Sequence, residues 1–293
     1  MRRRQRLKGI ELIATIVIAG VIVGILVLAL GRAREMRRRT ICANNLRQMG
    51  IVFKMYAEDW NGRFPQSQID DRDLNNIDVR LFCVNGRAIF PEYLSDASVL
   101  VCPSDSMGVE SFKAGRWNLD GDPSKPIVPE AFDAVSYVYF PWAANNDIEL
   151  QAMYEYARRI IESTPAGSPN VDVVDEDMNL FGTQWEEMGN AGGATIYRLR
   201  LGIERFFITD INMPAASASP KSKVPVMMDW LAIPPFFADY STISSVMHSF
   251  PGANVLFLDG HVEFLRYPGD FPVSTDSAKW IGMMYMMECN LSR

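Results

Sequence analysis

One stretch near the start of the chain restricts the possible folds more than any other feature. Residues 12–30 form a run of 19 residues without a charge, rich in Ile, Val, Leu and Ala. At about 1.5 Å per residue, a helix of this length measures roughly 28 Å, which matches the hydrocarbon core of a bilayer. The run is long for the apolar part of a cleaved signal peptide, so the sequence predicts a retained membrane anchor.

Charge is distributed unevenly around this run. Residues 1–40 carry ten Lys and Arg against two acidic residues, whereas residues 41–293 carry 19 against 33. The basic residues before the run favour a cytoplasmic N-terminus, but five more follow it: Arg32, Arg34, Arg37, Arg38 and Arg39. Phosphate backbones repel an acidic body, so the composition argues against nucleic-acid binding.

The helix is expected to continue beyond the membrane. Residues 31–59 contain no proline, and apolar residues recur there at steps of four and three, which predicts one apolar face on a helix. These residues are Cys42, Leu46, Met49, Phe53, Tyr56 and Trp60. Asn61 and Gly62, followed by Pro65, are typical of a helix end. The sequence therefore predicts one helix of about 50 residues, half in the membrane and half covering a soluble core.

Two features of the anchor suggest contacts with other chains. Glu11 lies at the edge of the apolar run, where a carboxylate costs less than at the bilayer centre. Its side chain either reaches the membrane surface or is a buried partner for a positive charge on a neighbouring chain. Gly20 and Gly24 form a GxxxG pattern, which lets helices approach closely in lipid, although glycine is also common in membrane helices.

Beyond Pro65 the pattern changes to short β-rich runs separated by turns. Residues 98–102, 135–140 and 223–228 are predicted strands, and residues 254–258 and 261–265 are predicted to form a hairpin. Asp259 and Gly260 between them tolerate the positive φ angles of a two-residue type I′ turn. The predicted fold is α+β, with a long helix backing an antiparallel sheet.

Two further helices and two insertions complete the predicted head. Residues 149–162 are a predicted helix with one apolar face, and residues 277–289 a predicted helix packed on the head, or else a Met-rich contact surface. Residues 104–129 and 163–193 are rich in Gly, Pro, Asp and Asn and are expected to be long surface insertions. The acidic run at residues 172–177 is expected to be a solvated loop.

Motifs for catalysis and cofactor binding are missing from the sequence. It contains no P-loop, no dinucleotide-binding glycine pattern, no CxxC pair and no Gly-x-Ser-x-Gly elbow, so we expect no enzyme activity and no cofactor. A minor alternative is a hydrolase site formed by His248, Asp259 and Ser249. Metal ligands must converge on one ion, so the sequence offers only weak candidates for a metal site: Asp229, His248, Asp259 and His261.

Several separate stretches form a recognisable combination. A basic start and an apolar helix with one early Glu lead into Arg32-Ala33-Arg34-Glu35, Cys42 and Asn45-Leu46-Arg47-Gln48-Met49-Gly50. Later stretches are Tyr56-Ala57-Glu58-Asp59, Asn61-Gly62-Arg63-Phe64-Pro65, Cys102-Pro103-Ser104-Asp105, residues 202–212 and residues 248–264. Together they resemble the type IV pilin and type II secretion pseudopilin superfamily. They look like a bacterial subgroup with a prepilin-type N-terminal helix and a head ending in His-x9/10-Asp-Gly.

The resemblance implies a pilin-like fold and a structural role. Residues 1–31 would be a membrane anchor and filament-core helix, residues 32–62 its amphipathic continuation, and residues 63–293 a globular β-rich head. The chain would be a subunit of a cell-surface filament or secretion assembly, with helices packed in the core and heads exposed. It would reside in the bacterial inner membrane with its head in the periplasm, or in an extracellular filament.

The resemblance also implies the partners of the chain. These would be copies of itself, the inner membrane during assembly, and secretion or pilus assembly machinery. The alternative is a membrane-anchored periplasmic or surface binding protein or enzyme that uses the N-terminal helix only as a tether.

One position departs from the prepilin pattern. Members of the superfamily are cut after a Gly, and the mature chain has Glu as its fifth residue. Aligning Glu11 with that Glu places Arg6 where the Gly is expected and Leu7 at the new N-terminus. The pattern therefore leaves open whether the prepilin peptidase processes this chain.

The resemblance further implies a disulfide. The family motifs around Cys42 and Cys102 recur together, and disulfides persist outside the cytoplasm. A bond between them would fasten the head to its own helix and close a loop of about 60 residues, worth roughly 4 kcal/mol in the chain-entropy model. This bond would leave Cys83 and Cys289 over, either as free thiols or bonded to each other. Four cysteines allow three full pairings.

Overall fold

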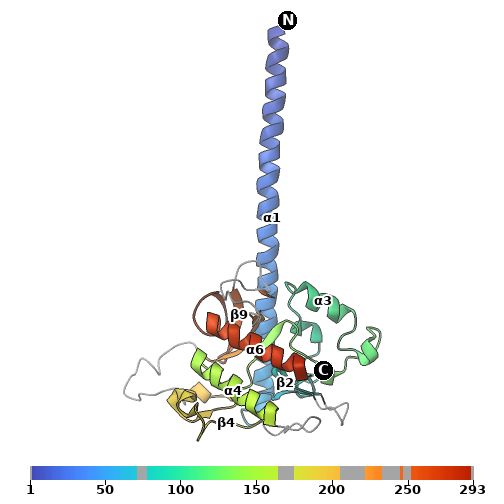
Figure 1. The fold of residues 1–293 in the computed structure, drawn as a ribbon. Coiled ribbons are helices and arrows are strands. Elements are labelled where there is room, and N and C mark those ends of the chain that lie inside the picture. Colours follow the sequence, from blue (N-terminus) through green and yellow to red (C-terminus); the bar gives the residue numbers. More distant parts are fainter. Residues whose placement is uncertain are drawn as a thin grey trace.

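The computed structural model describes residues 2–70, 78–163, 175–204, 222–232, 245–246 and 252–291. Its first helix, α1 (Arg2–Asp59), runs without a break from the anchor into the head. Figure 1 shows α1 as a straight stem whose C-terminal part lies against the head. The side chains of residues 17–34 are exposed, and Glu35 is the first buried one in the described part of α1. The prediction of one long continuous helix is confirmed.

The head-bound part of α1 buries the predicted apolar face. Cys42, Leu46, Met49 and Phe53 have no exposed surface. Trp60 differs from the prediction, because it follows the last helical residue and is 55% exposed, while Ala57 is buried.

The helix ends where the sequence predicts. Asn61 (φ 53°) and Gly62 (φ 81°) both take positive φ angles. The N–H of Gly62 donates to the carbonyl of Ala57 at 2.7 Å, so this reversal occupies a carbonyl that the helix itself leaves unpaired.

A four-stranded antiparallel sheet in the order β10-β9-β6-β3 forms the centre of the head. Its strands are β3 (Tyr137–Tyr139), β6 (Pro225–Asp229), β9 (Gly252–Phe257) and β10 (Val262–Arg266). All residues of β6 and β9 are buried, so this sheet is covered on both faces. Leu256 packs with the apolar face of α1, whereas its neighbour Val255 packs on the opposite side.

Two helices cover that opposite side of the sheet. They are α4 (Asp147–Ser163) and α6 (Thr275–Leu291), which contribute Leu150, Met153, Ala278, Ile281 and Met284 to the second apolar core. Both helices agree with the predicted positions, and α6 packs on the head as expected. The fold is α+β and consistent with a pilin-like fold, with α1, the sheet, and α4 with α6 as three layers.

Short elements fill the rest of the head. The two-stranded antiparallel pairs are β1 (Ser67–Asp70) with β2 (Asp78–Val84), β4 (Met178–Asn179) with β5 (Thr195–Ile196), and β7 (Leu231–Ala232) with β8 (Ser245–Val246). Helices α2 (Gly86–Ile89) and α3 (Ser106–Lys113) are short, and 3₁₀ turns occur at Ala97–Leu100, Leu119–Gly121, Pro129–Ala131, Glu186–Met188 and Asn190–Gly192.

The strand predicted at residues 98–102 is wrong. This segment forms the 3₁₀ turn Ala97–Leu100, because the Asp96 carboxylate accepts a hydrogen bond from the N–H of Ser98 at 2.9 Å and caps the turn. Cys102 therefore lies in a loop and not at a strand end. The insertion expected at residues 104–129 also differs, since Trp117 within it has no exposed surface and donates its indole N–H to Asp133 at 2.7 Å.

The hairpin of β9 and β10 is confirmed, but its turn is longer than predicted. The N–H of Gly260 donates to the carbonyl of Phe257 at 2.8 Å, and the N–H of Phe257 donates to the carbonyl of His261 at 3.0 Å. Gly260 takes a positive φ of 95°, and Asp259 does not. This is a three-residue loop ending in a glycine bulge, so the predicted type I′ turn is wrong.

Candidate functional site

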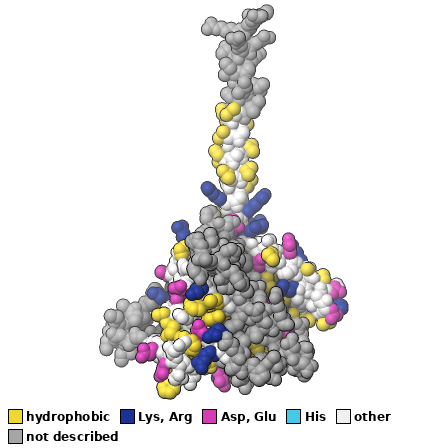
Figure 2. Space-filling model, in the orientation of Figure 1, with side chains coloured by type: hydrophobic (Ala, Val, Ile, Leu, Met, Phe, Trp, Pro, Cys, Tyr) yellow, Lys and Arg dark blue, Asp and Glu magenta, His cyan; other side chains and the backbone are white. Residues whose placement is uncertain are grey.

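The stem presents a continuous apolar surface outside the head. The segment Val17–Asp59 includes a stretch long and apolar enough to cross a membrane, and none of that stretch is buried. Figure 2 shows apolar side chains along the visible face of this part of α1. Gly20 and Gly24 lie on it in open space, where an added Cβ would meet no atom within 4 Å. The side chains of residues 1–16, which include Arg6, Leu7 and Glu11, lie outside the described part of the structure.

Basic side chains surround α1 between the apolar stem and the head. Arg32, Arg34, Arg37 and Arg38 are exposed, and we call them the arginine collar (Figure 2). Arg39 is different, because its guanidinium lies 3.4 Å from the ring centroid of Phe264 on β10 and is thus part of the head. Desolvation at this contact lowers the pKa of Arg39. The transition from membrane-type to head-type surface therefore takes place within two turns of one helix.

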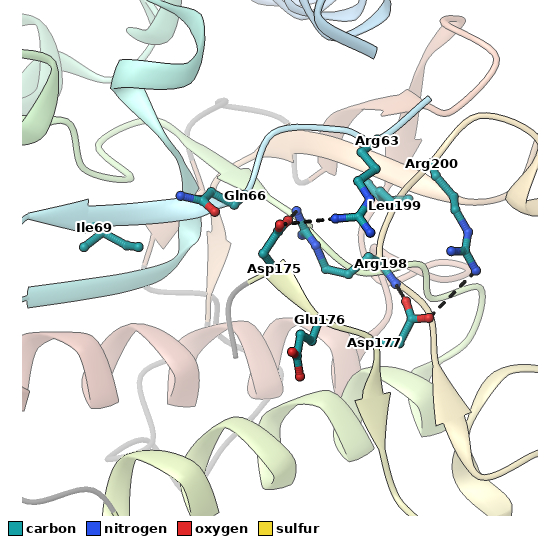
Figure 3. A pocket seen from close by; sticks show the side chains of 9 residues that line it. All are labelled: Arg63, Gln66, Ile69, Asp175, Glu176, Asp177, Arg198, Leu199 and Arg200. Atoms are coloured by element: carbon teal, nitrogen blue, oxygen red, sulfur yellow. Dashed lines mark hydrogen bonds and ion pairs between the residues drawn. The ribbon is translucent and has the colours of Figure 1, made fainter. Parts of the chain in front are cut away.

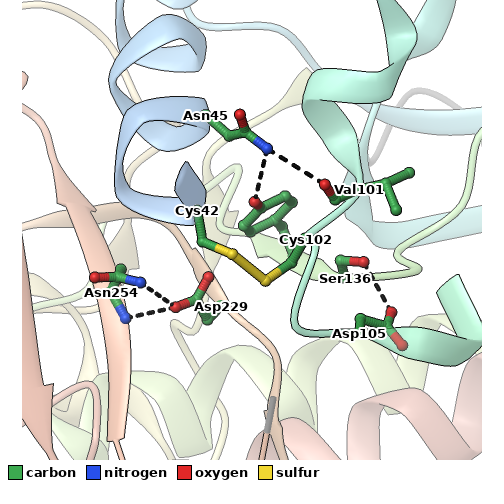
Figure 4. Close-up of a disulfide and its surroundings, with 9 residues drawn as sticks. Cys42, Asn45, Val101, Cys102, Asp105, Ser136, Asp229 and Asn254 are labelled. Carbon is green, nitrogen blue, oxygen red and sulfur yellow. Dashed lines mark hydrogen bonds between the residues drawn. A yellow bond between two sulfur atoms is a disulfide. The ribbon is translucent and has the colours of Figure 1, made fainter. Parts of the chain in front are cut away.

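A disulfide fastens the head to α1 immediately below the collar. Cys42 of α1 is bonded to Cys102, and their Cα atoms are 5.4 Å apart (Figure 4). Both half-cystines are fully buried, which confirms the predicted pairing. Cys83 is also buried, and the side chain of Cys289 lies outside the described residues.

Asn45 joins the same two segments one turn further along α1. Its Nδ2 donates to the carbonyl of Val101 and to the hydroxyl of Tyr137, each at 3.3 Å (Figure 4). Burial raises the pKa of Tyr137 well above its ordinary value, so this hydroxyl remains neutral. Helix, loop and strand β3 thus meet at one partly buried polar contact.

A second polar group lies beside the disulfide. Asp229 at the end of β6 is fully buried, and its Oδ2 accepts hydrogen bonds from the backbone N–H and the side-chain amide of Asn254 at 2.8 and 2.6 Å. The ligand atoms of Asp229, Cys42 and Cys102 lie within 4.8 Å of one another. In the disulfide state the two sulfur atoms are bonded to each other and supply no thiolate, so this group is not a metal site as it stands.

Of the predicted metal candidates that the structure describes, Asp259 and His261 lie together, but Asp229 lies apart from them. Asp229 lies beside Asn254, whereas Asp259 and His261 lie in the loop that follows the other end of β9. His248, which completes the predicted set, lies outside the described residues together with Ser249. The expectation of a shared metal site or a hydrolase site therefore gains no support from the described residues.

Asp259 instead joins the hairpin loop to α1, and His261 pairs with Asp259 within the loop. The Oδ1 of Asp259 lies 2.6 Å from Nδ1 of His261, and Lys54 of α1 donates to the Asp259 carbonyl at 2.5 Å. Burial opposes ionisation of Asp259, but hydrogen bonds from His261 and from the N–H of Ser222 outweigh it and lower the pKa of the Asp259 carboxyl. This carboxylate has a structural role at the turn.

A polar cavity of about 640 Å³ opens on the head near the end of α1 (Figure 3). It is lined by three arginines and three acidic residues, together with Gln66, Ile69 and Leu199. The charged residues are Arg63, Arg198, Arg200, Asp175, Glu176 and Asp177. Asp175 pairs with Arg63 at 3.4 Å and Arg198 at 3.5 Å, and Asp177 pairs with Arg200 at 3.8 Å. Asp175, Glu176 and Asp177, the described part of the acidic run, therefore form one wall of the cavity, where Glu176 and Asp177 remain exposed as expected. The formal charges of the three arginines and the three acidic residues cancel.

Arg198 at this cavity connects segments of the chain that lie far apart in the sequence. It is 6% exposed, and its guanidinium donates to the carbonyl of Pro141 at 2.5 Å and to that of Pro65 at 3.0 Å. Tyr139 donates its hydroxyl to the same Pro65 carbonyl at 2.6 Å. Desolvation lowers the pKa of Arg198. Sequence reasoning missed this residue, because its partners are backbone carbonyls far away in the sequence, which no side-chain pattern reveals.

One comparison with known proteins yields a match. A family model described as a protein of unknown function, DUF1559, matches residues 31–80. The matched region contains the arginine collar, the head-bound part of α1 and strand β1. This family is associated with pilin-like proteins, so the similarity suggests a pilin-like surface protein. Searches of curated proteins and of solved structures found no match.

Proposed function

We propose that the chain is a structural subunit of a pilin-like or pseudopilin-like assembly, in which the α1 helices of several copies pack together and the heads remain outside. The observation that carries this proposal is the continuity of α1, which joins an exposed apolar half to a half that is built into the head. A mere tether does not need that continuity. The similarity over residues 31–80 supports the proposal, because it covers the part of the chain where the two halves join.

The outward face of the head-bound half also supports assembly. Ile41, Ile51 and Met55 lie on it and are 38%, 60% and 45% exposed. At about 100° per residue, these positions lie on the side of α1 opposite to Leu46 and Phe53, which face the sheet. A neighbouring α1 that packs along the stem would cover them.

The proposed location follows from the same argument. The apolar half of α1 would hold the subunit in the bacterial inner membrane before assembly, with the head in the periplasm, and the assembled form would be an extracellular filament or a secretion pseudopilus. A disulfide between Cys42 and Cys102 is compatible with an oxidising compartment. Partners would be other copies of the chain and the assembly machinery, with no cofactor and no catalytic step.

The test is assembly of the full chain with Glu11 replaced. Glu11→Ala should impair incorporation into filaments or pseudopili and leave membrane insertion intact, because the positive charge on the neighbouring chain would lose its buried carboxylate partner. Thr15→Ala, one turn away, is the control and should assemble normally. Electron microscopy of surface material and mass spectrometry of the N-terminus measure the outcome, and a normal filament yield from Glu11→Ala would contradict the role of Glu11.

The polar cavity favours a second candidate, a tethered binding protein. Its arginines offer cationic hydrogen-bond donors and its carboxylates offer anionic acceptors, which suits a small polar ligand. This lining does not mark one side chain as a nucleophile. Replacing Arg63 and Arg200 with Gln would disable such a binding protein. A structural subunit with both changes would still assemble.

A further inference from the structure

We infer that the arginine collar binds the headgroups of anionic phospholipids in the leaflet that faces the head, and thereby holds the head at the membrane surface. The inference rests on α1 crossing a membrane, as proposed above, but not on assembly into a filament. Its ligand class is the phosphodiester of an acidic lipid such as phosphatidylglycerol.

The position of the collar is the first observation. The uncharged run ends at Leu30, and the first buried side chain of the head-bound part is Glu35. The collar spans residues 32–38, so its guanidinium groups begin within about 3 Å of helix rise after the apolar run. That is the depth at which lipid phosphates surround a helix that emerges from a bilayer.

The distribution of the four arginines around α1 decides between a lipid and a protein partner. An α-helix turns by about 100° per residue, so these positions leave no arc wider than about 140° without an arginine. A partner protein would contact one side of the helix and would select a stripe. Headgroups surround a crossing helix on all sides, and only such a ligand uses the whole collar.

The charges of the collar are available for binding. In the part of the chain that the structure describes, no ion pair or hydrogen bond to another residue occupies Arg32, Arg34, Arg37 or Arg38. Glu35 is the only acidic residue between positions 31 and 39, and it is 8% exposed on the head side. Arginine presents a planar fork of donors that matches a phosphate, and its long stem can reach the interface from a helix.

The collar also solves an electrostatic problem of the head. Residues 41–293 carry 19 basic and 33 acidic residues, so an anionic membrane repels the head as a whole. Cationic groups at the junction counteract this repulsion where the head comes nearest to the lipid, because the surface potential decays within about a Debye length.

The experiment measures lipid selectivity of the full chain. The protein is reconstituted into vesicles of phosphatidylcholine and phosphatidylglycerol, and electron paramagnetic resonance of spin-labelled lipids gives the relative association constant for the two headgroups. The original chain should prefer phosphatidylglycerol severalfold at low salt, and high salt should reduce the preference. In the variant with all four collar arginines changed to Gln, the preference should fall markedly toward one.

A matched variant controls for the loss of charge. In this variant, Gln replaces four exposed basic residues of the head, Arg47, Lys113, Arg159 and Lys223. Its lipid preference should stay as in the original chain. The basic residues before the anchor are present in all three proteins, so the differences report the collar alone. Resistance to alkaline extraction shows that each variant is still inserted.

A collar variant with an unchanged preference for phosphatidylglycerol would overturn the inference. If that variant also loses self-association, the collar contacts another copy of the chain instead of lipid. Failure of Glu11→Ala to affect assembly would contradict the proposed function and leave the lipid result as it is.

Discussion

The side-chain amide of Asn45 lies 3.3 Å from the carbonyl oxygen of Val101, the residue that precedes the half-cystine Cys102. Asn45 also reaches the hydroxyl of Tyr137 on β3. The disulfide of Cys42 and the hydrogen bond from Asn45 to Val101 both extend from the same side of α1, about one helical turn apart. The loop at residues 101–102 is therefore held at two successive points of the stem.

Asn45→Ala should lower the free energy of unfolding of the head by about 1–2 kcal/mol, because it removes two hydrogen bonds and leaves the buried Tyr137 hydroxyl with less compensation. Asn44→Ala is the matched control, since Asn44 is exposed and bonds to Arg47 on the same helix. Its effect should stay within about 0.5 kcal/mol. Urea denaturation under oxidising conditions measures both, and equal effects of the two changes would contradict the role of Asn45.

The disulfide should contribute more than any single hydrogen bond at this junction. The double variant Cys42→Ser, Cys102→Ser should lose about 2–4 kcal/mol of unfolding free energy, because its unfolded chain is no longer constrained by a closed loop. Reductant should destabilise the original chain by a similar amount and leave the double variant unchanged. Sensitivity of the double variant to reductant would mean that another disulfide carries the effect.

Glu149 should make the stability of the head depend on pH. It is 3% exposed, and burial raises the pKa of its carboxyl even though the N–H of Asn145 donates to it at 2.7 Å. A raised pKa in the folded state favours the protonated form. This stabilisation is complete below the unfolded value of about 4.3 and is lost as the pH rises through the folded value.

Glu149→Gln is the variant that tests this pH dependence. Gln keeps an acceptor for the N–H of Asn145 and cannot ionise. As the pH rises from the unfolded to the folded pKa of Glu149, the unfolding free energy of the original chain should therefore fall more than that of the variant. Denaturation at a series of pH values from 3 to 7 is the measurement. Parallel curves for the two proteins would show that Glu149 does not titrate differently on folding.

Gly24→Ile should weaken contacts between anchors in the membrane and leave the head folded. Gly20 and Gly24 give α1 a flat surface in open space, and a β-branched side chain there keeps a second helix at a distance. Ala19→Ile adds bulk to another side of the same exposed helix and should have little effect. Crosslinking between anchors in vesicles compares the two, and equal crosslinking would show that the GxxxG pattern is incidental.

Periodicity was sufficient to predict the main helices and the terminal hairpin. The steps of four and three from Cys42 to Phe53 predicted the buried face of α1, because residues at this spacing share one side of any helix. The hairpin was predicted from two β-rich runs around Asp259 and Gly260. Its turn type was wrong, since Asp-Gly fits both a two-residue turn and a loop that ends in a glycine bulge.

Features that depend on distant partners could not be predicted in the same way. Arg198 is held by carbonyls of residues 65 and 141, and Asp229 by Asn254, and no local pattern marks either contact. Residues 98–102 have β propensity, but one hydrogen bond from the N–H of Ser98 to Asp96 outweighs it. The acidic residues at 175–177 resemble a solvated loop until the fold brings Arg63 and Arg200 to them.

The position of the disulfide has a mechanical consequence. A pull on the anchor enters the head through α1 and reaches Cys42 before it reaches most of the head-bound helix. The bond to Cys102 then passes the tension across a sequence separation of 60 residues, so the intervening segment cannot be drawn out. At about 3.3–3.6 Å per extended residue, this segment would otherwise lengthen the subunit by up to roughly 200 Å. A subunit under tension from its anchor would thus stay short, and its sheet and second helical layer would bear the strain as one unit.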